Sequence, residues 1–347
     1  MLSFKLGKNL SWFLIGISIA AILGMQYLGK VTPGMIPFFA IITFLASIFI
    51  IVKSSDYTVY SMEDYSKKTK LPHFLVGFVI LSIVTVFPDL FTGIFVSQAG
   101  HGEMILGDIL TATLIDVVLL IGITAFIIKK VPINEPELKG STPWLILGLM
   151  VLPLLMFIDG KLNQVEAILL LIGFASYLVF MTRRELKVSH IVKSIAFRSI
   201  WKDIFIFGIN LGALILGARW MTLSAGIIAE NFGISPFIIG FIFIAFGNSI
   251  AEIVFTTQMA RKGESDMSLG NSFGSVLVNI LVVWGVAALV RPLEVSKMFI
   301  YSYIALLVVM VGVIWLVQKN NYLTRKHGII LLVVYLLFTV INVIVNY

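Results

Sequence analysis

Three carboxylic acids lie inside apolar stretches of the sequence, where a charge is costly. They are Asp89, Asp116 and Glu252. If these stretches cross a membrane, each ionised acid costs about 2.5–3.5 kcal/mol on insertion scales, so such residues usually mark a functional site. No Lys, Arg or His is close in sequence to any of the three. Two simpler interpretations remain open: the acids are neutral, or they pair with a distant base such as Lys53 or Arg219.

Side chains that carry oxygen accompany these acids at helical spacing. Residues four apart lie on the same face of a helix. The pairs with this spacing are Thr85 and Asp89, Asn248 and Glu252, and Ser275 and Asn279, with Ser249 beside the second pair. Carboxylate, amide and hydroxyl oxygens suit hard cations such as Na⁺, Ca²⁺ or Mg²⁺, and argue against zinc or copper. The chain has no Cys and four scattered His residues, which agrees with an oxygen-only cation site.

Breaks in two helices are expected next to these acids. Pro88 lacks a backbone N–H, so it should free a carbonyl one turn earlier, near Val84. Gly247 marks the corresponding place before Glu252. Discontinuous helices in mid-membrane commonly supply carbonyl oxygens to the ion sites of transporters, although a lone proline can also be an ordinary kink.

The composition predicts that these residues belong to a membrane protein. Of the 347 residues, 59% are hydrophobic and only 12% are charged, whereas soluble domains carry about 25% charged residues. This balance excludes disordered, collagen-like and nucleic-acid-binding architectures. A membrane-spanning helix needs about 20 apolar residues. Eleven apolar segments run approximately over residues 10–28, 35–51, 74–97, 104–128, 144–158, 165–181, 204–228, 234–259, 267–290, 298–317 and 328–345.

The loops between these segments predict an orientation, because cytoplasmic loops are enriched in Lys and Arg. With the N-terminus in the cytoplasm, most of the basic loop residues fall inside. Those that fall outside are Lys30, Lys161, Arg291 and Lys297. Eleven spans then leave the C-terminus outside. Segment 10–28 lacks a convincing small-residue cleavage site after it, so we expect a retained helix and not a signal peptide.

The sequence also contains an internal repeat. Residues 76–127 align without a gap on residues 239–290, which lie 163 positions further along. Four glycines coincide, and Asp89, Asp108 and Asp116 fall on an acid or an amide. Each unit holds five spans, so the second unit enters the membrane from the opposite side, as in many secondary transporters.

The predicted fold is an all-α polytopic membrane protein with two inverted five-helix repeats and one extra N-terminal helix. The expected parts are an extra transmembrane helix (1–32), a first repeat (33–181), a basic cytoplasmic linker (182–203) and a second repeat (204–347).

The repeated segments resemble the α-repeats of the cation/calcium antiporter superfamily, which includes the sodium/calcium exchangers. The family motifs are G-T-S-x-P-E, followed on the next helix by G-N-x-x-G-S-N-x-x-N or D. Residues 85–89 read TVFPD and residues 247–252 read GNSIAE. The second motif appears as GDILTATLID at 107–116 and as GNSFGSVLVN at 270–279. The resemblance covers residues 35–345 and is stronger in the second repeat.

The resemblance implies a set of residues that bind Ca²⁺ and Na⁺ alternately. The implied ligands are the side chains of Thr85, Asp89, Asp116, Asn248, Ser249, Glu252, Ser275 and Asn279, with the carbonyls of Ser82 and Ala245. The first repeat departs from the family pattern, because Val86 and Ala112 stand where hydroxyl residues are expected. The third acid also lies in the first repeat, at Asp116, and its counterpart in the second repeat is Asn279. Sodium/calcium exchangers often have the reverse arrangement, with the acid in the second repeat.

We therefore expect an ion antiporter and not an enzyme. The leading interpretation is Na⁺/Ca²⁺ exchange by alternating access, in which segments 35–70 and 204–232 slide past the ion-binding core, as the resemblance implies. Exchange of Ca²⁺ for H⁺ is less favoured, because proton-coupled relatives carry a shorter G-N-A-x-E motif. Li⁺, Mg²⁺ or K⁺-dependent exchange stays open. The expected partners are Ca²⁺, Na⁺ and the bilayer of the cell membrane, with no cofactor and no nucleic acid. The oligomeric state is open, and a monomer is compatible with the sequence.

Two other classes of protein remain as alternatives. An intramembrane enzyme could use Asp89 and Asp116 as a pair, but the sequence lacks both the Y-D and G-x-G-D combination and the D-D-x-x-D motif. A channel would conduct without a counter-ion, whereas an antiporter requires one.

Overall fold

The computed structural model describes residues 36–69, 78–79, 82–133, 136–186, 197–245, 247–249, 252–253, 256 and 265–346. The expected N-terminal helix (1–32) and the middle of the expected linker (187–196) lie outside the described residues. Helices dominate the described part of the chain, in agreement with the predicted all-α class.

The first half of the chain contains the helices on which Asp89 and Asp116 lie. Its elements are α2 (Ile36–Thr69), α4 (Ser82–Thr85), α5 (Phe87–Ala99), α6 (Gly102–Leu114), a π-helical segment η3 (Ile115–Leu120), α7 (Ile121–Ile128), β1 (Lys130–Pro132), α8 (Pro136–Lys139), α9 (Thr142–Met156), a 3₁₀ turn η4 (Phe157–Asp159), β2 (Lys161–Leu162) and α10 (Gln164–Leu186).

The second half follows a closely similar order. Its elements are α11 (Phe197–Phe232), α12 (Pro236–Ile238), a π-helical segment η5 (Ile239–Ile244), α14 (Ser265–Leu277), a π-helical segment η6 (Val278–Val283), α15 (Trp284–Val290), β3 (Leu293–Glu294), α16 (Lys297–Lys319), β4 (Tyr322–Thr324) and α17 (Arg325–Asn346). The bounds of α14 and η6 lie 163 residues after those of α6 and η3. The offset found in the sequence therefore recurs in the element boundaries.

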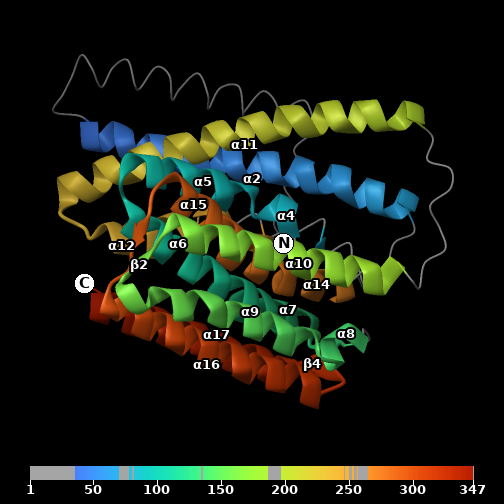
Figure 1. Cartoon of the computed structure of the whole chain (residues 1–347). Helices are drawn as coiled ribbons and strands as arrows, with labels where there is room; N and C mark the ends of the chain where they lie inside the picture. The colour runs from blue at the N-terminus through green and yellow to red at the C-terminus, as the bar shows by residue number, and fades with distance from the viewer. Residues whose placement is uncertain are drawn as a thin grey trace.

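Two short antiparallel sheets join the halves. Strand β1 pairs with β4, so that Val131 lies opposite Leu323. Strand β2 pairs with β3, so that Leu162 lies opposite Leu293. Figure 1 shows β2 and β4 at opposite ends of the molecule, so each end carries one such connection.

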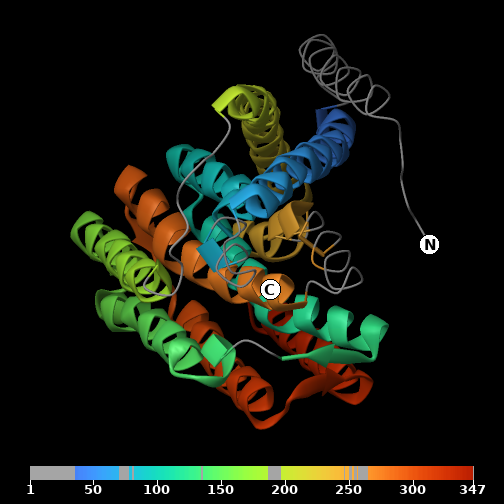
Figure 2. The same ribbon diagram turned by 90° about the vertical axis from the view of Figure 1, so that its right-hand side faces the viewer.

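The helices form three groups when viewed along their length. Helices α2 and α11 pack along each other on one side (Figures 1 and 2). Helices α9, α10, α16 and α17 lie on the opposite side, and α5, α6, α14 and α15 lie between the two groups (Figure 2). The middle group is the most buried: 72% and 78% of an 18-residue stretch within Gly102–Ile128 and Met267–Val290 is enclosed, against 22% for such a stretch in the outer α10 and α17.

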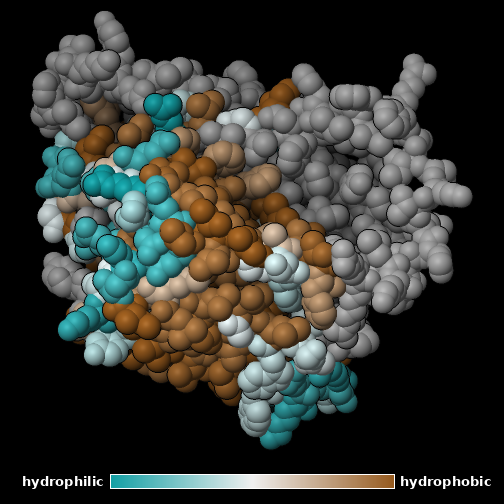
Figure 3. Space-filling view, in the orientation of Figure 1, coloured by the Kyte–Doolittle hydropathy of each residue, from teal (hydrophilic) through white to brown (hydrophobic). Residues whose placement is uncertain are grey.

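The outer surface is suited to a lipid bilayer. Six helices among the described residues are long and apolar enough to cross a membrane. Figure 3 shows a broad apolar belt between hydrophilic patches at the two ends of the helices. Leu155, Ile172, Val308 and Ile344 are among the large apolar side chains exposed on this surface. The chain is therefore a multi-pass membrane protein.

Close contacts at glycines fix the middle helices against one another. A Cβ at Gly240 would lie 1.8 Å from the carbonyl oxygen of Met104, and a Cβ at Gly107 would lie 2.5 Å from that of Phe237. Such distances exclude any side chain at these two positions without movement of the backbone. Glycine therefore lets α6 and η5 cross closely enough to bring the polar residues of both halves together.

Candidate cation site

A break in the helix positions the first group of predicted ligands. Helix α4 ends at Thr85, Val86 lies between the helices, and α5 begins at Phe87 with Pro88 in its first turn. This is the interruption that Pro88 predicts. The carbonyl of Ser82 accepts hydrogen bonds from the backbone N–H of Val86 (3.2 Å) and from Thr85 Oγ1 (3.4 Å). The break predicted near Gly247 is flanked by residues 246, 250 and 251, which lie outside the described part of the chain.

Two hydrogen bonds join predicted ligands from different halves. Asn248 Nδ2 donates to Asp89 Oδ1 at 2.7 Å. Asn279 Nδ2 donates to Asp116 Oδ2 at 3.0 Å. All four residues are buried. Asp116 and Asn279 are 163 residues apart, so the structure places two repeat-aligned residues in direct contact.

The hydroxyl of Thr85 extends this network to α14. Thr85 Oγ1 lies 3.5 Å from Ser275 Oγ and 3.4 Å from Asn271 Oδ1. Glu252 lies beside Thr85, Ser275 and Asp116, although neither of its carboxylate oxygens has a partner with hydrogen-bond geometry among the described residues. The polar side chains of α4, α5, η3, α14 and η6 therefore meet around one buried region.

Several oxygens in this region are buried without a hydrogen bond among the described residues. They are Asp116 Oδ1, Asn248 Oδ1, Ser249 Oγ, Asn279 Oδ1 and both oxygens of Glu252. A buried polar atom without a partner is costly, so each one requires an explanation. A cation bound among them would supply the missing interaction for all of them at once.

A pairing of the acids with Arg219 finds no support. The charged groups that act on Asp89 and Asp116 in the described part of the chain are other acids, Glu252 among them. Arg219 is exposed on α11. No three His, Asp or Glu side chains in the described ranges are placed to hold one metal ion by themselves. Amides and hydroxyls lie between the carboxylates, so a cation here would have mixed ligands.

The backbone carbonyls of Ser82 and Ala245 are predicted cation ligands, and both residues are buried. Ser82 Oγ donates to the carbonyl of Phe78. Ala245 directly follows the π-helical segment η5. The two departures from the family pattern, Val86 and Ala112, are completely buried, which leaves apolar side chains in the first half where the second half has Ser249 and Ser275.

Sequence reasoning missed two polar residues that belong to the same buried layer. Asn271 contacts Thr85 and is fully buried. Asp108, its counterpart 163 residues earlier, is also fully buried. The alignment of the two repeats already paired an acid with an amide at this position, and that was the available signal.

The π-helical segments are a second feature that hydropathy does not reveal. Asp116 is the second residue of η3, and Asn279 is the second residue of η6. Single π turns are rare and occur frequently at functional sites, since they shift side chains relative to a regular helix. They place Asp116 and Asn279 at matching points of the two halves.

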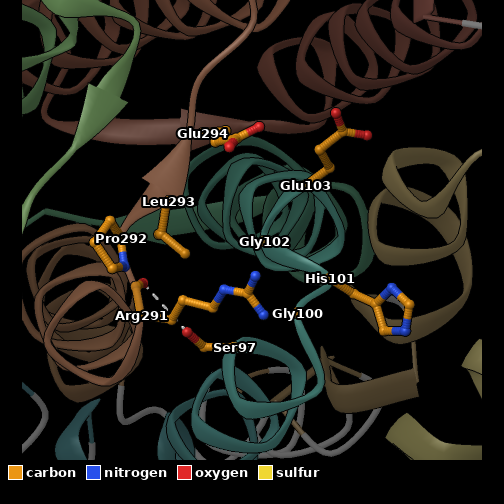
Figure 4. Close-up of a pocket in the computed structure, with 9 residues that line it drawn as sticks. All are labelled: Ser97, Gly100, His101, Gly102, Glu103, Arg291, Pro292, Leu293 and Glu294. Atoms are coloured by element: carbon orange, nitrogen blue, oxygen red, sulfur yellow. Dashed lines mark hydrogen bonds between the residues drawn. The ribbon is translucent and has the colours of Figure 1, made fainter.

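A pocket of about 280 Å³ opens at one end of α5 and α15, away from the predicted ligands (Figure 4). It contains Arg291, Glu103 and Glu294, while Ser97 Oγ donates to the carbonyls of Ala287 (2.7 Å) and Arg291 (3.4 Å). Asp89 and Ser97 are eight positions apart on α5, a rise of about 12 Å. The pocket therefore lies roughly two helical turns from the buried oxygens.

Comparison with known proteins gives a consistent result. The family described as "Sodium/calcium exchanger protein" matches residues 39–183 and 202–344. The sodium/calcium exchanger MaX1 of Methanosarcina acetivorans is 24% identical over 344 residues, which cover 86% of this chain and 96% of the relative. The putative antiporter CaxA of Alkalimonas amylolytica is 26% identical over 261 residues, covering 73% and 81%.

The fold also resembles that of a solved structure. A structure of the sodium-calcium exchanger NCX_Mj soaked with 10 mM Na⁺ and zero Ca²⁺ matches with a TM-score of 0.67 and 21% identity. The match covers 87% of this chain and 98% of that chain. At this identity the similarity establishes the fold.

Proposed function

The chain belongs to the sodium/calcium exchanger protein family, and from this premise we propose that it exchanges Ca²⁺ for Na⁺ across the cell membrane. The family consists of exchangers of cations and calcium. In this proposal Ca²⁺ and Na⁺ are substrates that bind in turn to the buried oxygens between α4, α5, η3, α14 and η6. The protein acts as an antiporter and performs no bond-breaking chemistry.

The observation that carries the proposal is a set of buried carboxylates on which, in the described part of the chain, other acids act. Asp89, Asp116 and Glu252 are at most 2% exposed. Their polar neighbours are amides, hydroxyls and, for Asp116 and Glu252, each other. Carboxylate, amide and hydroxyl oxygens are the ligands that hard cations prefer. Ca²⁺ requires about 6–8 oxygens, and the predicted ligand set offers that number from both halves.

We propose that the two halves are inverted repeats and that exchange uses alternating access. The recurrence of α6–η3 as α14–η6, and the symmetric contact between Asp116 and Asn279, support this arrangement. Helices α2 and α11 pack mainly along each other on one side of the middle group, which suits elements that slide as a pair. The movement would expose the buried oxygens first to one side of the membrane and then to the other.

Transport by the purified protein in proteoliposomes tests this function. Vesicles loaded with Na⁺ should take up ⁴⁵Ca²⁺ when diluted into Na⁺-free buffer, and uptake should stop when the Na⁺ gradient is collapsed. Parallel gradients of K⁺, Li⁺ and H⁺ identify the coupling ion. Uptake that persists without any counter-ion would indicate a channel and would contradict antiport. Absence of exchange under every gradient, with Ca²⁺ binding also absent, would contradict the proposal altogether.

We further propose that the N-terminus is cytoplasmic and the C-terminus external. The basic loop residues support this orientation. The chain has no Cys, so a single introduced cysteine reports its own position. In intact cells, Lys161→Cys should react with a membrane-impermeant maleimide, whereas Lys319→Cys should react only after permeabilisation. The reverse pattern would invert the topology.

A further inference from the structure

Asp108 is a buried acid that the predicted ligand set does not use. It lies on α6, it is fully buried, and neither carboxylate oxygen has a hydrogen-bond partner among the described residues. Asp89 is the charged group that acts on it. Two neighbouring ionised acids in an apolar interior repel each other and lack solvent, so both stay ionised only when a cation compensates their charge.

The counterpart of Asp108 in the second half indicates which part of the site Asp108 lies near. Asn271 lies 163 residues after Asp108, and its Oδ1 is 3.4 Å from the hydroxyl of Thr85, a predicted ligand. The counterpart of Thr85 in the second half is Asn248, which donates a hydrogen bond to Asp89 and whose buried Oδ1 has no partner among the residues that the structure describes. By the repeat, Asp108 should stand to Asn248 as Asn271 stands to Thr85. Asp108 is therefore placed on the side of the site that holds Asn248 and Asp89.

The backbone of Asp108 is held in place. Its neighbour Gly107 packs so closely on the backbone of Phe237 and Phe241 that a Cβ would lie 2.5–3.0 Å from their atoms. Helix α6 is therefore in direct backbone contact with the second half of the chain one residue before Asp108. Placement on a packed helix of the interior, and not on a loop, is a condition for a selective ion ligand.

Asp108 also stands one helical turn before Ala112, on the same face of α6. The second half has Asn271 and Ser275 at the corresponding positions, an amide followed by a hydroxyl. The first half has instead a carboxylate followed by a methyl group. The oxygen missing at Ala112 is thus accompanied by an added charge one turn away.

We propose that Asp108 is a direct ligand of the transported cation, next to Asp89, and forms a fourth carboxylate of the site. This inference rests on the proposed function and specifies its ion preference. A fourth negative charge favours Ca²⁺ over Na⁺. At the same distance, a carboxylate attracts a divalent cation twice as strongly as a monovalent one. The first half therefore compensates for lost hydroxyl ligands with charge.

The substitution Asp108→Asn tests the proposal, since it keeps the shape and introduces the residue that the second half carries. Isothermal titration of the whole purified protein in detergent, with CaCl₂ and NaCl as probes, should show Ca²⁺ affinity reduced by at least about tenfold. Na⁺ affinity should fall less. Without ions the variant should melt at the same or a higher temperature, because an unpaired buried acid is removed. Glu103→Gln, an exposed change on the same helix, is the matched control and should leave both affinities unchanged.

The outcomes separate this inference from the proposed function. Wild-type protein that binds neither ion would contradict the function itself. Wild-type binding together with unchanged Ca²⁺ and Na⁺ affinities in Asp108→Asn would overturn only the role of Asp108. Should Asp108→Asn fail to fold, Asp108→Glu decides: a ligand role requires an altered ratio of Ca²⁺ to Na⁺ affinity, whereas an unchanged ratio refutes it.

Discussion

Glu252→Gln is expected to abolish exchange while the protein remains folded. The substitution keeps the shape of the side chain and removes one charge beside Thr85, Ser275 and Asp116. Loss of one charged partner of a buried ion costs about 2–5 kcal/mol, which weakens binding by well over tenfold. We expect Na⁺-driven ⁴⁵Ca²⁺ uptake to fall to the background of protein-free vesicles. Glu230→Gln, an exposed change on α11, should transport normally.

Thermal stability distinguishes this loss from misfolding. A ligand at 100 times its Kd stabilises the protein that binds it by about 2.7 kcal/mol. Wild-type protein should therefore melt at a higher temperature with Ca²⁺ than without it. Glu252→Gln should melt like the ion-free wild type under both conditions. Wild-type transport by this variant would remove Glu252 from the site.

The second large effect concerns the contact between Asp116 and Asn279. Their 3.0 Å hydrogen bond places one carboxylate and one amide at matching points of η3 and η6. We expect Asp116→Asn alone to abolish exchange, because it removes a charge from the region. Combining it with Asn279→Asp returns the charge to the same contact from the opposite helix. The double variant should recover part of the exchange, measured as initial rate of ⁴⁵Ca²⁺ uptake.

The control for this exchange of residues is Asn279→Asp alone, which adds a carboxylate beside Asp116. Two acids at this distance repel each other, so ion-free protein should be less stable and Ca²⁺ should restore more stability than in the wild type. If the double variant folds but is as inactive as Asp116→Asn, the total charge at this contact is not what matters. The two residues would then have separate roles.

The motifs in the sequence were sufficient to predict the family and the membrane class, and both are confirmed. Pro88 correctly predicted a break between α4 and α5, because a proline cannot continue the hydrogen-bond pattern of the preceding turn. The repeat alignment paired Asp116 with Asn279, and the structure places these two residues in contact. Those features depend on local chemistry or on symmetry, which a single sequence carries.

Other features depend on how helices cross, and the sequence did not predict them. Thr85 meets Asn271 because α4 and α14 approach closely at Gly274, where a Cβ would lie 2.8 Å from Cβ of Ser82. The π-helical turns at Asp116 and Asn279 leave no mark in an apolar run, because hydropathy does not depend on the number of residues per turn. For Asp108 the repeat alignment held a signal, but its burial without a hydrogen-bond partner among the described residues emerges only from the packing of the helices.

The lengths of α2 and α11 have a consequence for the membrane itself. These helices contain 34 and 36 residues, so each is about 50 Å long, against a hydrocarbon core of about 30 Å. Even at the steep tilt of 40° they would still cover about 38 Å. The apolar part of α2 is only Pro37–Ile51, so the helix extends beyond the hydrocarbon core. If the pair slides as proposed, its polar ends would move toward the lipid tails or the bilayer around them would thin. Lipids with shorter or longer acyl chains should consequently change the speed of exchange without changing the affinity for either ion.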